Sequence, residues 1–492
     1  MTTCSSTCCR AGITNPGPRA TYDAHIQSTF AVISSRSVIT IVGGGFAGTA
    51  LALHLARQPG LLARADVHLI EPRPTPGPGL AYAPGPPEHL LNVRPGPLSL
   101  YPDRPAHFAD WLARQPETAG GVPEFAPRPL YGRYLTQELA TVLGPGGVRW
   151  HQAAALSAAL GASARRIVRL SDGTAIDSDY VVLALGNFPP PPPAGPALEY
   201  LAHPCYHANP WGPGALAGIG PNEAVLLIGA GLTAVDVLMA LHRQGHHGPV
   251  VAVARHGRWP AAHGPAGISY PGFYAELANL TTVNGVVAVL KRHIRRAAAQ
   301  GLDWQPVLDA LRPELGRIWA AWPLAEQARF LRHAAALWAV ARHRSPPQNT
   351  ATIAALTATG LLRLVTGRVQ AIARAGPDLL VEVQKRNGGL VTHRARHVVC
   401  CTGPLLDYHG IATPLVQQLR AAGHLLPDPL GLGIQTDACG SLLADDSRPA
   451  PDLFTLGPSR RPAYFESTAV PEVRQQAVAL ATELAARIAT GG

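Results

Sequence analysis

Three glycines are the residues whose type and spacing most clearly allow chemistry. Gly43, Gly45 and Gly48 form the pattern GxGxxG between the apolar segment SVITIV and the helical segment TALALHLAR. In such a strand, turn and helix, the first glycine permits the tight turn, the second lets a pyrophosphate approach the helix N-terminus, and the third lets helix and strand pack closely. Since both flanking elements are present, the pattern predicts a dinucleotide-binding turn.

A carboxylate stands where such a site needs one. Glu71 follows the next apolar strand, DVHLI, at the distance from the glycines where an acid accepts hydrogen bonds from an adenosine ribose. We therefore predict that this unit binds FAD; the alternative is a structural glycine turn with Glu71 capping a surface loop. The predicted FAD ligands in this part of the chain are Gly43, Gly45, Phe46, Ala47, Gly48 and Glu71.

The pattern occurs a second time, as GxGxxA, after the apolar segment 224–228 and before the helical segment VDVLMALHRQG. Each unit also has a downstream hairpin and a return strand, ending at Gly186 in the first unit and at Gly403 in the second. The duplication predicts two nucleotide-binding units. Gly186 is assigned to the first cofactor, and the second cofactor is assigned to Gly229, Gly231, Leu232 and Thr233.

The two units differ in charge. The second strand of the second unit, PVVAVARHGR, ends in Arg255, His256 and Arg258, where the first unit has Glu71. A guanidinium suits a 2′-phosphate, so we predict that NADPH binds here in preference to NADH, held by Arg255 with Arg258 or His256 assisting. The alternative is that these are solvated surface cations.

These motifs require an α/β fold with two tandem Rossmann-like dinucleotide-binding domains, the second inserted in the first, and a helical insert. The predicted boundaries are 1–36 for a disordered leader, 37–190 and 395–492 for the FAD-binding domain, 205–275 and 346–394 for the NADP-binding domain, and 276–345 for the helical insert. The insert carries Trp319, Trp322 and Trp338 at spacings typical of a core, although such an insert can also roof a substrate pocket.

Composition narrows the functional class. The chain has 41 Lys and Arg against 31 Asp and Glu, a net charge of +10, but its basic residues form no runs with interleaved aromatics, so a nucleic-acid partner is not expected. No run approaches the roughly 18 apolar residues that a membrane span needs. The histidines show no ligand spacing, and no metal site is expected. The 7 cysteines are too few and too scattered for a disulfide framework, which favours a reducing cytoplasm.

The chain resembles the bacterial FAD/NAD(P)-binding proteins, whose relatives include flavin-dependent monooxygenases that oxidise amino nitrogen. The resemblance covers residues 37–490 and rests on segments such as IVGGGFAGTALALHL, VLLIGAGLTAVDVL, LRPELGRIWAAWPLAEQARFLRH and FESTAVPEVRQQA. It implies that Asn92 and Val93 lie near the flavin ring and that Gly457 lies near the FAD pyrophosphate. It also implies backbone donors at the start of the last helix, from Thr468, Ala469 and Val470.

More distantly, the chain is similar to class B flavin monooxygenases, and it keeps His207 and Trp211 of their FxGxxxHxxxW fingerprint. This resemblance implies an NADPH-dependent monooxygenase that uses molecular oxygen, through a peroxyflavin, on a small nucleophilic substrate such as an amine or amino acid. We expect its pocket to lie between the flavin and the insert, roofed by residues 330–340. The alternatives are a flavin reductase or dehydrogenase, and a flavin redox sensor without turnover. The sequence contains no CxxC motif, which argues against a disulfide reductase. The spacing of the residues identifies no catalytic side chain, and the sequence does not predict the oligomeric state.

Overall fold

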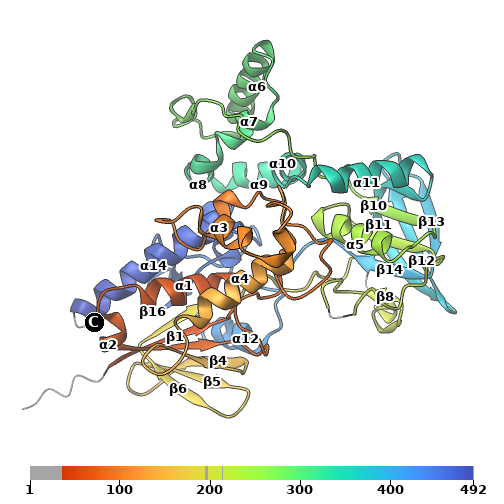
Figure 1. Cartoon of the computed structure of the whole chain (residues 1–492). Coiled ribbons are helices and arrows are strands. Elements are labelled where there is room, and N and C mark those ends of the chain that lie inside the picture. The colour runs from red at the N-terminus through yellow and green to blue at the C-terminus, as the bar shows by residue number, and fades with distance from the viewer. Residues whose placement is uncertain (1–35, 194, 196–197, 213, 491–492) are drawn as a thin grey trace, which may run out of the picture. The chain divides into compact units, whose positions relative to one another are not determined.

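The computed structural model describes residues 36–193, 195, 198–212 and 214–490. The predicted leader, with Cys4, Cys8 and Cys9, therefore lies outside the described residues apart from Arg36. Within the described chain, two sheets of parallel strands, one small antiparallel sheet and a group of helices make up the α/β fold that the sequence predicts (Figure 1).

The first large sheet has six strands in the order β15-β16-β7-β1-β2-β3. Its strands are β1 (Ser37–Val42), β2 (Ala65–Ile70), β3 (Val148–His151), β7 (Tyr180–Leu183), β15 (Ser441–Leu443) and β16 (Pro449–Thr455). All neighbours are parallel except β15 and β16. The strands β1, β2 and β7 match the apolar segments from which the first dinucleotide unit was predicted.

Alternation of side chains along these strands gives the first sheet two buried faces. In β1, Ile39 and Ile41 pack into a core with helices α1 (Phe46–Ala56), α4 (Arg128–Ala140) and α14 (Val470–Thr490). Val42 packs on the opposite face. That face is covered by α12 (Pro414–Ala421) and the small sheet of β4 (Ala155–Leu160), β5 (Arg166–Leu170) and β6 (Ala175–Ser178). Figure 1 shows α1, α4 and α14 together on one side of the sheet.

The second large sheet has the order β13-β12-β11-β10-β9-β14-β8. Its strands are β8 (Tyr206–His207), β9 (Val225–Ile228), β10 (Val250–Ala254), β11 (Leu362–Ala375), β12 (Asp378–Lys385), β13 (Leu390–Ala395) and β14 (His397–Cys400). Strands β11, β10, β9, β14 and β8 run parallel, while β12 and β13 extend the sheet as an antiparallel meander. Helices α5 (Leu232–Arg243) and α11 (Pro347–Ala358) pack together on one face.

The predicted return to the first domain at residue 395 is too early. Strand β14 pairs with β9 and β8, so it belongs to the second sheet, because its all-buried residues His397–Cys400 fill the place next to β9. The chain leaves the first sheet after β7 and comes back after β14, and the two crossings lie side by side where Phe188 forms a bridge with Leu405. Below, "first unit" and "second unit" mean the two large sheets with the helices that pack on them.

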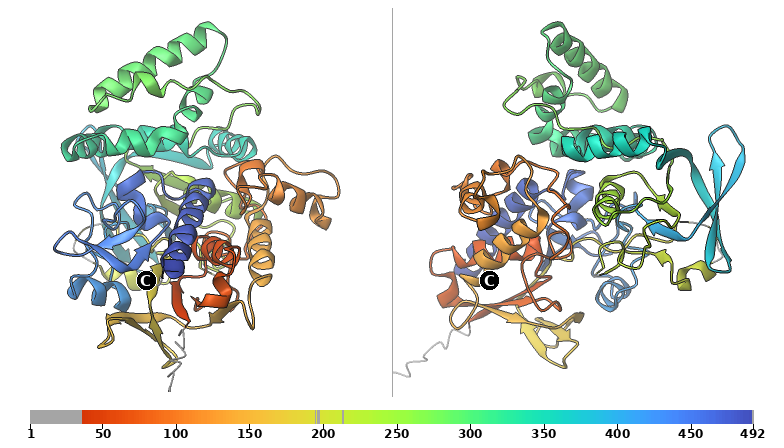
Figure 2. Two further views of the ribbon diagram at one scale, coloured as in Figure 1. Left: turned by 90° about the vertical axis from the view of Figure 1, so that its left-hand side faces the viewer. Right: turned by 45° about the vertical axis from the view of Figure 1, so that its right-hand side comes forward.

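The predicted helical insert consists of five helices, shown as a group in Figures 1 and 2. They are α6 (Val283–Ala299), α7 (Gln305–Asp309), α8 (Leu315–Ala320), α9 (Leu324–His333) and α10 (Ala335–Arg342). Trp319 and Trp322 are buried in the core of this group, as their spacing predicts, whereas Trp338 is partly buried against it. Phe465 from the first unit's chain stacks on Trp319 and packs edge-on against Phe330.

The described chain also contains the short helices α2 (Leu61–Arg64), α3 (His107–Ala113) and α13 (Arg461–Tyr464). Among the described residues, no helix is both long enough and apolar enough to cross a membrane.

Candidate functional site

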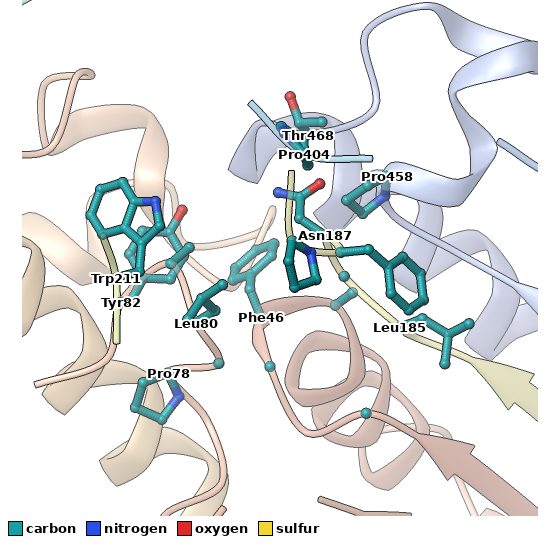
Figure 3. Close-up of a pocket in the computed structure, with 18 of the residues that line it drawn as sticks. Phe46, Pro78, Leu80, Tyr82, Leu185, Asn187, Trp211, Pro404, Pro458 and Thr468 are labelled. Carbon is teal, nitrogen blue, oxygen red and sulfur yellow. The ribbon is translucent and has the colours of Figure 1, made fainter. Parts of the chain in front are cut away.

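A cavity of about 380 Å³ opens where β1 and β7 of the first unit end (Figure 3). Segments that immediately follow these two strands line it, including Gly43, Gly45 and Gly186. The carboxyl ends of parallel strands, at the point where the strand order reverses, are where open α/β sheets bind ligands. The cavity therefore lies where the sequence predicts the first dinucleotide.

The glycine turn at this cavity cannot carry side chains at its first and third positions. Gly43 has a φ of +110°, and a Cβ there would lie 2.2 Å from the carbonyl oxygen of Ala184. A Cβ on Gly48 would lie 1.9 Å from the carbonyl oxygen of Gly43. These contacts give the physical reason for both glycines: the turn passes directly against β7, and helix α1 presses on the turn.

Helix α1 points its N-terminus into the cavity. Its N-cap is Gly45, which has no side chain to accept hydrogen bonds from the first turn, and Gly45, Phe46 and Ala47 all line the cavity. Free backbone N–H groups and the positive end of the helix dipole make such a terminus suited to a phosphate. A Cβ on Gly45 would approach Gly79 Cα at 3.3 Å, so the turn is also closed from the side.

Glu71 follows β2 and is 2% exposed. One carboxylate oxygen accepts a hydrogen bond from the Gly44 N–H at 2.9 Å, and the other accepts from the Arg73 backbone at 3.0 Å and from Arg73 Nε at 2.8 Å. The Arg73 side chain is 45% exposed and also lines the cavity. Arg73 Nη2 also donates to Glu71 at 3.4 Å, so these four bonds use the roughly four lone-pair sites of the carboxylate, and a ribose hydroxyl would bind there by replacing bonds from the half-exposed Arg73 side chain. Arg73 was not predicted from the sequence.

The residues assigned to the flavin end reach the cavity in part. Asn92 and Thr468 line it, and Val473 of α14 and Pro458 lie beside them. Ala469 and Val470 stand at the start of α14, outside the lining. Val93 packs against the apolar core of the first unit instead.

Gly457 joins the end of β16 to the cavity wall. Its φ is +85°, and a Cβ there would lie 3.4 Å from Ala47 Cβ in the first turn of α1. Its N–H donates to Gln476 Oε1 at 2.9 Å, and its carbonyl accepts from Ser467 Oγ at 2.6 Å. Gly457 therefore packs beside the turn that Gly45 begins, next to the predicted phosphate position.

The second glycine turn faces the same cavity. Gly229 has a φ of +114°, and Gly231 is the N-cap of α5 with no side-chain cap. Leu232 begins the helix, and Thr233 in its first turn lines the cavity, together with Gly403 after β14. The cavity thus reaches the first turn of α5, whereas the predicted residues Gly229, Gly231 and Leu232 do not themselves line it.

Arg255, His256 and Arg258 lie in the loop that follows β10 and are exposed. None of them lines the cavity, and within the described chain no ion pair holds Arg255 or Arg258. Because β9 and β10 are parallel neighbours, this loop and the Gly229 turn share one edge of the second sheet. The cations are therefore on the correct edge for a nucleotide that extends outward from the α5 turn.

Two histidines and one tyrosine around the cavity, His263, His89 and Tyr82, are uncharged near neutral pH. Burial lowers the pKa of His263, whose Nε2 donates to the Asn92 carbonyl at 2.9 Å and so ties this flavin-side segment to the segment between β10 and α6. Burial also raises the pKa of Tyr82 to about 12 and lowers the pKa of His89. Tyr82 lines the cavity, and its phenol stays protonated.

The cysteines of the return strand have no redox partner in the described chain. Cys205, Cys400 and Cys401 are buried and free, and burial raises the pKa of the Cys401 thiol well above its usual value. A buried thiol with a raised pKa is a poor nucleophile. Burial and the raised pKa therefore favour a structural role for Cys401.

Residues 330–340 do not line this cavity, which lies at the predicted FAD turn, so a substrate pocket between the flavin and the insert stays a prediction. The lining residues come from segments between 43 and 233 and between 400 and 473, and the described residues of the insert contribute none. The apolar faces of the insert pack instead on Leu432 and Phe465, because these side chains fill the space between the helices.

The sequence also missed a charged contact at the cavity's edge. Arg128 of α4 lines the cavity and pairs with Asp236 of α5, with Arg128 Nη1 2.9 Å from Asp236 Oδ2. The Arg128 guanidinium lies over the Trp211 ring at 5.2 Å. Trp211 was singled out as part of a fingerprint, but its partner was not predictable from local sequence.

Comparison with known proteins agrees with this architecture. Residues 40–188 match the family described as FAD-NAD(P)-binding, a range that includes the Gly43 turn, Glu71 and Gly186. The resemblance inferred from the motifs is thereby confirmed for this part of the chain. No curated protein sequence matches the chain.

Solved structures extend the likeness of fold to most of the chain. Ornithine hydroxylase (PvdA) from Pseudomonas aeruginosa superposes with a TM-score of 0.63 at 15% identity, over 91% of this chain and 98% of that one. L-lysine 6-monooxygenase from Pseudomonas syringae gives 0.62 at 18% identity, over 92% and 99%. Ornithine N-hydroxylase KtzI from Kutzneria sp. 744, with reduced FAD, NADP+ and L-ornithine, gives 0.62 at 15% identity, over 92% and 99%. At these identities the likeness shows the fold.

Proposed function

We propose that the protein is an FAD- and NADPH-dependent monooxygenase that oxygenates the nitrogen of a small amine or amino acid. The observation that carries the proposal is a single cavity lined by the first dinucleotide turn, at Gly45, and by Thr233 in the first turn of α5, beside the second dinucleotide turn. A protein that passes hydride from a nicotinamide to a flavin needs both cofactors within reach of one space. The similarity of fold to N-hydroxylases of ornithine and lysine supports the choice of reaction.

The residues present fit FAD in the first unit. The open N-terminus of α1 and the close-packed glycines suit a pyrophosphate, and the buried Glu71 carboxylate suits an adenosine ribose. Asn92, Thr468 and the start of α14 would border the ring system, where a helix N-terminus favours negative charge. When bound, FAD would supply the redox chemistry of the reaction.

The second unit fits NADPH. The α5 turn offers free N–H groups to a pyrophosphate, and Arg255, with Arg258 or His256, supplies positive charge at the same sheet edge for a 2′-phosphate. The protein's own contribution is then to bind and orient both cofactors and to limit water in the cavity, whose walls include Leu80, Phe46 and Trp211.

The test starts from the purified protein with its flavin identified after release by chromatography. NADPH and NADH oxidation is then followed with and without ornithine, lysine, cadaverine and acidic amino acids. We expect NADPH to be the better reductant, and one amine to raise its oxidation and to gain an atom from labelled dioxygen. Turnover that never labels a product, whatever the amine, would leave a flavin reductase as the better assignment.

A further inference from the structure

The relative placement of the two glycine turns depends on contacts between the two units. One such contact is the ion pair of Arg128 with Asp236, at 2.9 Å. The Arg128 side chain is only 14% exposed and that of Asp236 only 5%. An ion pair shielded from water holds its geometry far better than a surface pair, which water screens.

On the first unit, Arg128 is bonded to the segment that leads into the flavin end of the cavity. Its Nε donates to the Leu90 carbonyl at 3.0 Å, and its backbone N–H donates to the His89 carbonyl at 2.8 Å. Leu91 and Asn92, which follow directly, line the cavity. The guanidinium therefore binds the flavin-side segment, through the Leu90 carbonyl, and the second unit, through Asp236, at the same time.

On the second unit, Asp236 lies one helical turn beyond Thr233 in α5. Because an α-helix is rigid over one turn, fixing Asp236 also fixes the Gly231–Thr233 turn, which is the predicted NADPH pyrophosphate site. Aromatic side chains enclose the pair: the Trp211 ring lies 5.2 Å from the Arg128 guanidinium and 5.6 Å from the His89 ring. This contact gives Trp211 a role that its sequence position alone did not reveal.

We propose that Arg128, paired with Asp236, is a positioning residue for hydride transfer between the two cofactors. It fixes the α5 turn relative to Leu91 and Asn92, and so sets the distance from nicotinamide to flavin. This inference rests on the proposed function. Reacting groups must sit within a narrow range of distance, and a displacement of about 1 Å can slow a reaction about 100-fold.

The variants must remove the pair without leaving a buried charge. Arg128→Met alone would strand the Asp236 carboxylate in the interior, so the main test is the double variant Arg128→Met with Asp236→Leu. Arg128→Lys is the conservative variant: it keeps a cation beside Asp236 but cannot reach the Leu90 carbonyl with a second donor. Arg243→Gln is the matched control, because Arg243 also lies on α5 and pairs with Glu88 of the first unit at 3.2 Å, but its side chain is 73% exposed.

Three measurements are made on each FAD-loaded protein: anaerobic flavin reduction by saturating NADPH, flavin reduction by dithionite, and amide hydrogen exchange in residues 89–92 and in α5. For the double variant we expect reduction by NADPH to slow about 10- to 100-fold while reduction by dithionite is unchanged. We also expect faster exchange in both segments. Arg128→Lys should be intermediate in all respects, and Arg243→Gln should match the native protein.

Native rates of reduction by NADPH in both the double variant and Arg128→Lys would overturn the inference. If the double variant does not fold with FAD, Arg128→Lys decides alone: an unchanged rate overturns the inference and a slower rate with normal dithionite reduction supports it. A native protein that dithionite reduces but NADPH does not would overturn the proposed function. In that case the exchange measurement still shows whether Arg128 joins the two units.

Discussion

The first and second glycine turns can be compared contact by contact. Gly43 and Gly229 both have a left-handed backbone, with φ of +110° and +114°. The N–H of each donates at 2.8 Å to a carbonyl at the end of the neighbouring strand, Ile70 in one unit and Val253 in the other. A Cβ on Gly43 would clash with the Ala184 carbonyl, which follows β7. A Cβ on Gly229 would clash with the Cys401 carbonyl, which follows β14. Such agreement shows that the turn's shape follows from the parallel sheet itself.

The units differ in the side chains that surround this common turn. The third position is Gly48 in the first unit and the buried residue Ala234 in the second, so only α1 presses its backbone onto the turn. The strand that follows ends in the buried Glu71 in one unit and in the exposed Arg255 in the other. The comparison supports our proposal that the shared turn is the phosphate site and that the residue after the second strand selects the nucleotide.

Exchanging the third position should have the largest effect. Gly48→Ala places a Cβ 1.9 Å from the Gly43 carbonyl, so α1 must move off the sheet, at a cost of about 3 kcal/mol in the free energy of unfolding. Ala234→Gly, the reciprocal change, adds no clash and should cost about 1 kcal/mol through helix propensity. Urea unfolding of both variants measures the difference. Equal costs would mean that α1 and α5 approach their turns equally closely.

The middle glycines should separate the two cofactors. Gly45→Val places a branched side chain at the N-terminus of α1, where the predicted FAD pyrophosphate lies, and the protein should purify without flavin. A Cβ on Gly231 would meet no other part of the described chain within 4 Å, so Gly231→Val should fold, retain FAD and lose affinity for NADP+. Flavin absorbance and NADP+ titration test the pair. Full FAD occupancy in Gly45→Val would refute the assignment of the first unit.

The sequence predicted the parts of this site whose residues are close together in the chain, and it missed the parts whose residues are far apart in the chain. The Gly43 and Gly229 turns and Glu71 were predicted because strand, turn and helix are adjacent in the chain. Arg128 and Asp236 were missed because their pairing depends on how two separate units pack. The boundary at 395 was placed before strand β14, although the motif analysis itself gave the return strand that ends at Gly403 to the second unit, and the pairing of β14 with β9 confirms that motif assignment.

Removing the cation of the second unit should have a smaller effect than blocking its turn. Arg255→Ala should weaken NADPH binding by about 10- to 100-fold, because a charge-assisted hydrogen bond typically contributes about 1.5 to 3 kcal/mol. NADH binding should be unaffected, since NADH has no 2′-phosphate. Steady-state KM values for both nucleotides test this. Arg258→Ala is the comparison variant, and an equal loss for NADPH and NADH in Arg255→Ala would contradict the assignment.

The predicted effect of pH concerns two buried histidine pairs, one in each unit. His68 Nδ1 lies 2.8 Å from His151 Nε2 in the first unit, and His207 Nε2 lies 3.0 Å from His397 Nδ1 in the second. Burial, reinforced by His151 and Arg149, lowers the pKa of His68 to about 4. Between its ordinary value of 6.5 and about 4, the unfolded chain binds a proton that the folded chain does not.

Stability should therefore fall as the pH drops from about 6.5 toward 4 and change little further through this group below that range. His68→Phe removes the titrating group and should recover about 2 kcal/mol of the free energy of unfolding at pH 5 relative to pH 7. Burial also lowers the pKa of His207, so His207→Phe is the matched variant in the second unit and should likewise reduce the acid sensitivity. Thermal unfolding of both variants at pH 5 and pH 7 measures the difference. If His68→Phe loses as much stability between pH 7 and pH 5 as the native protein does, groups other than His68 cause the loss and the prediction is wrong.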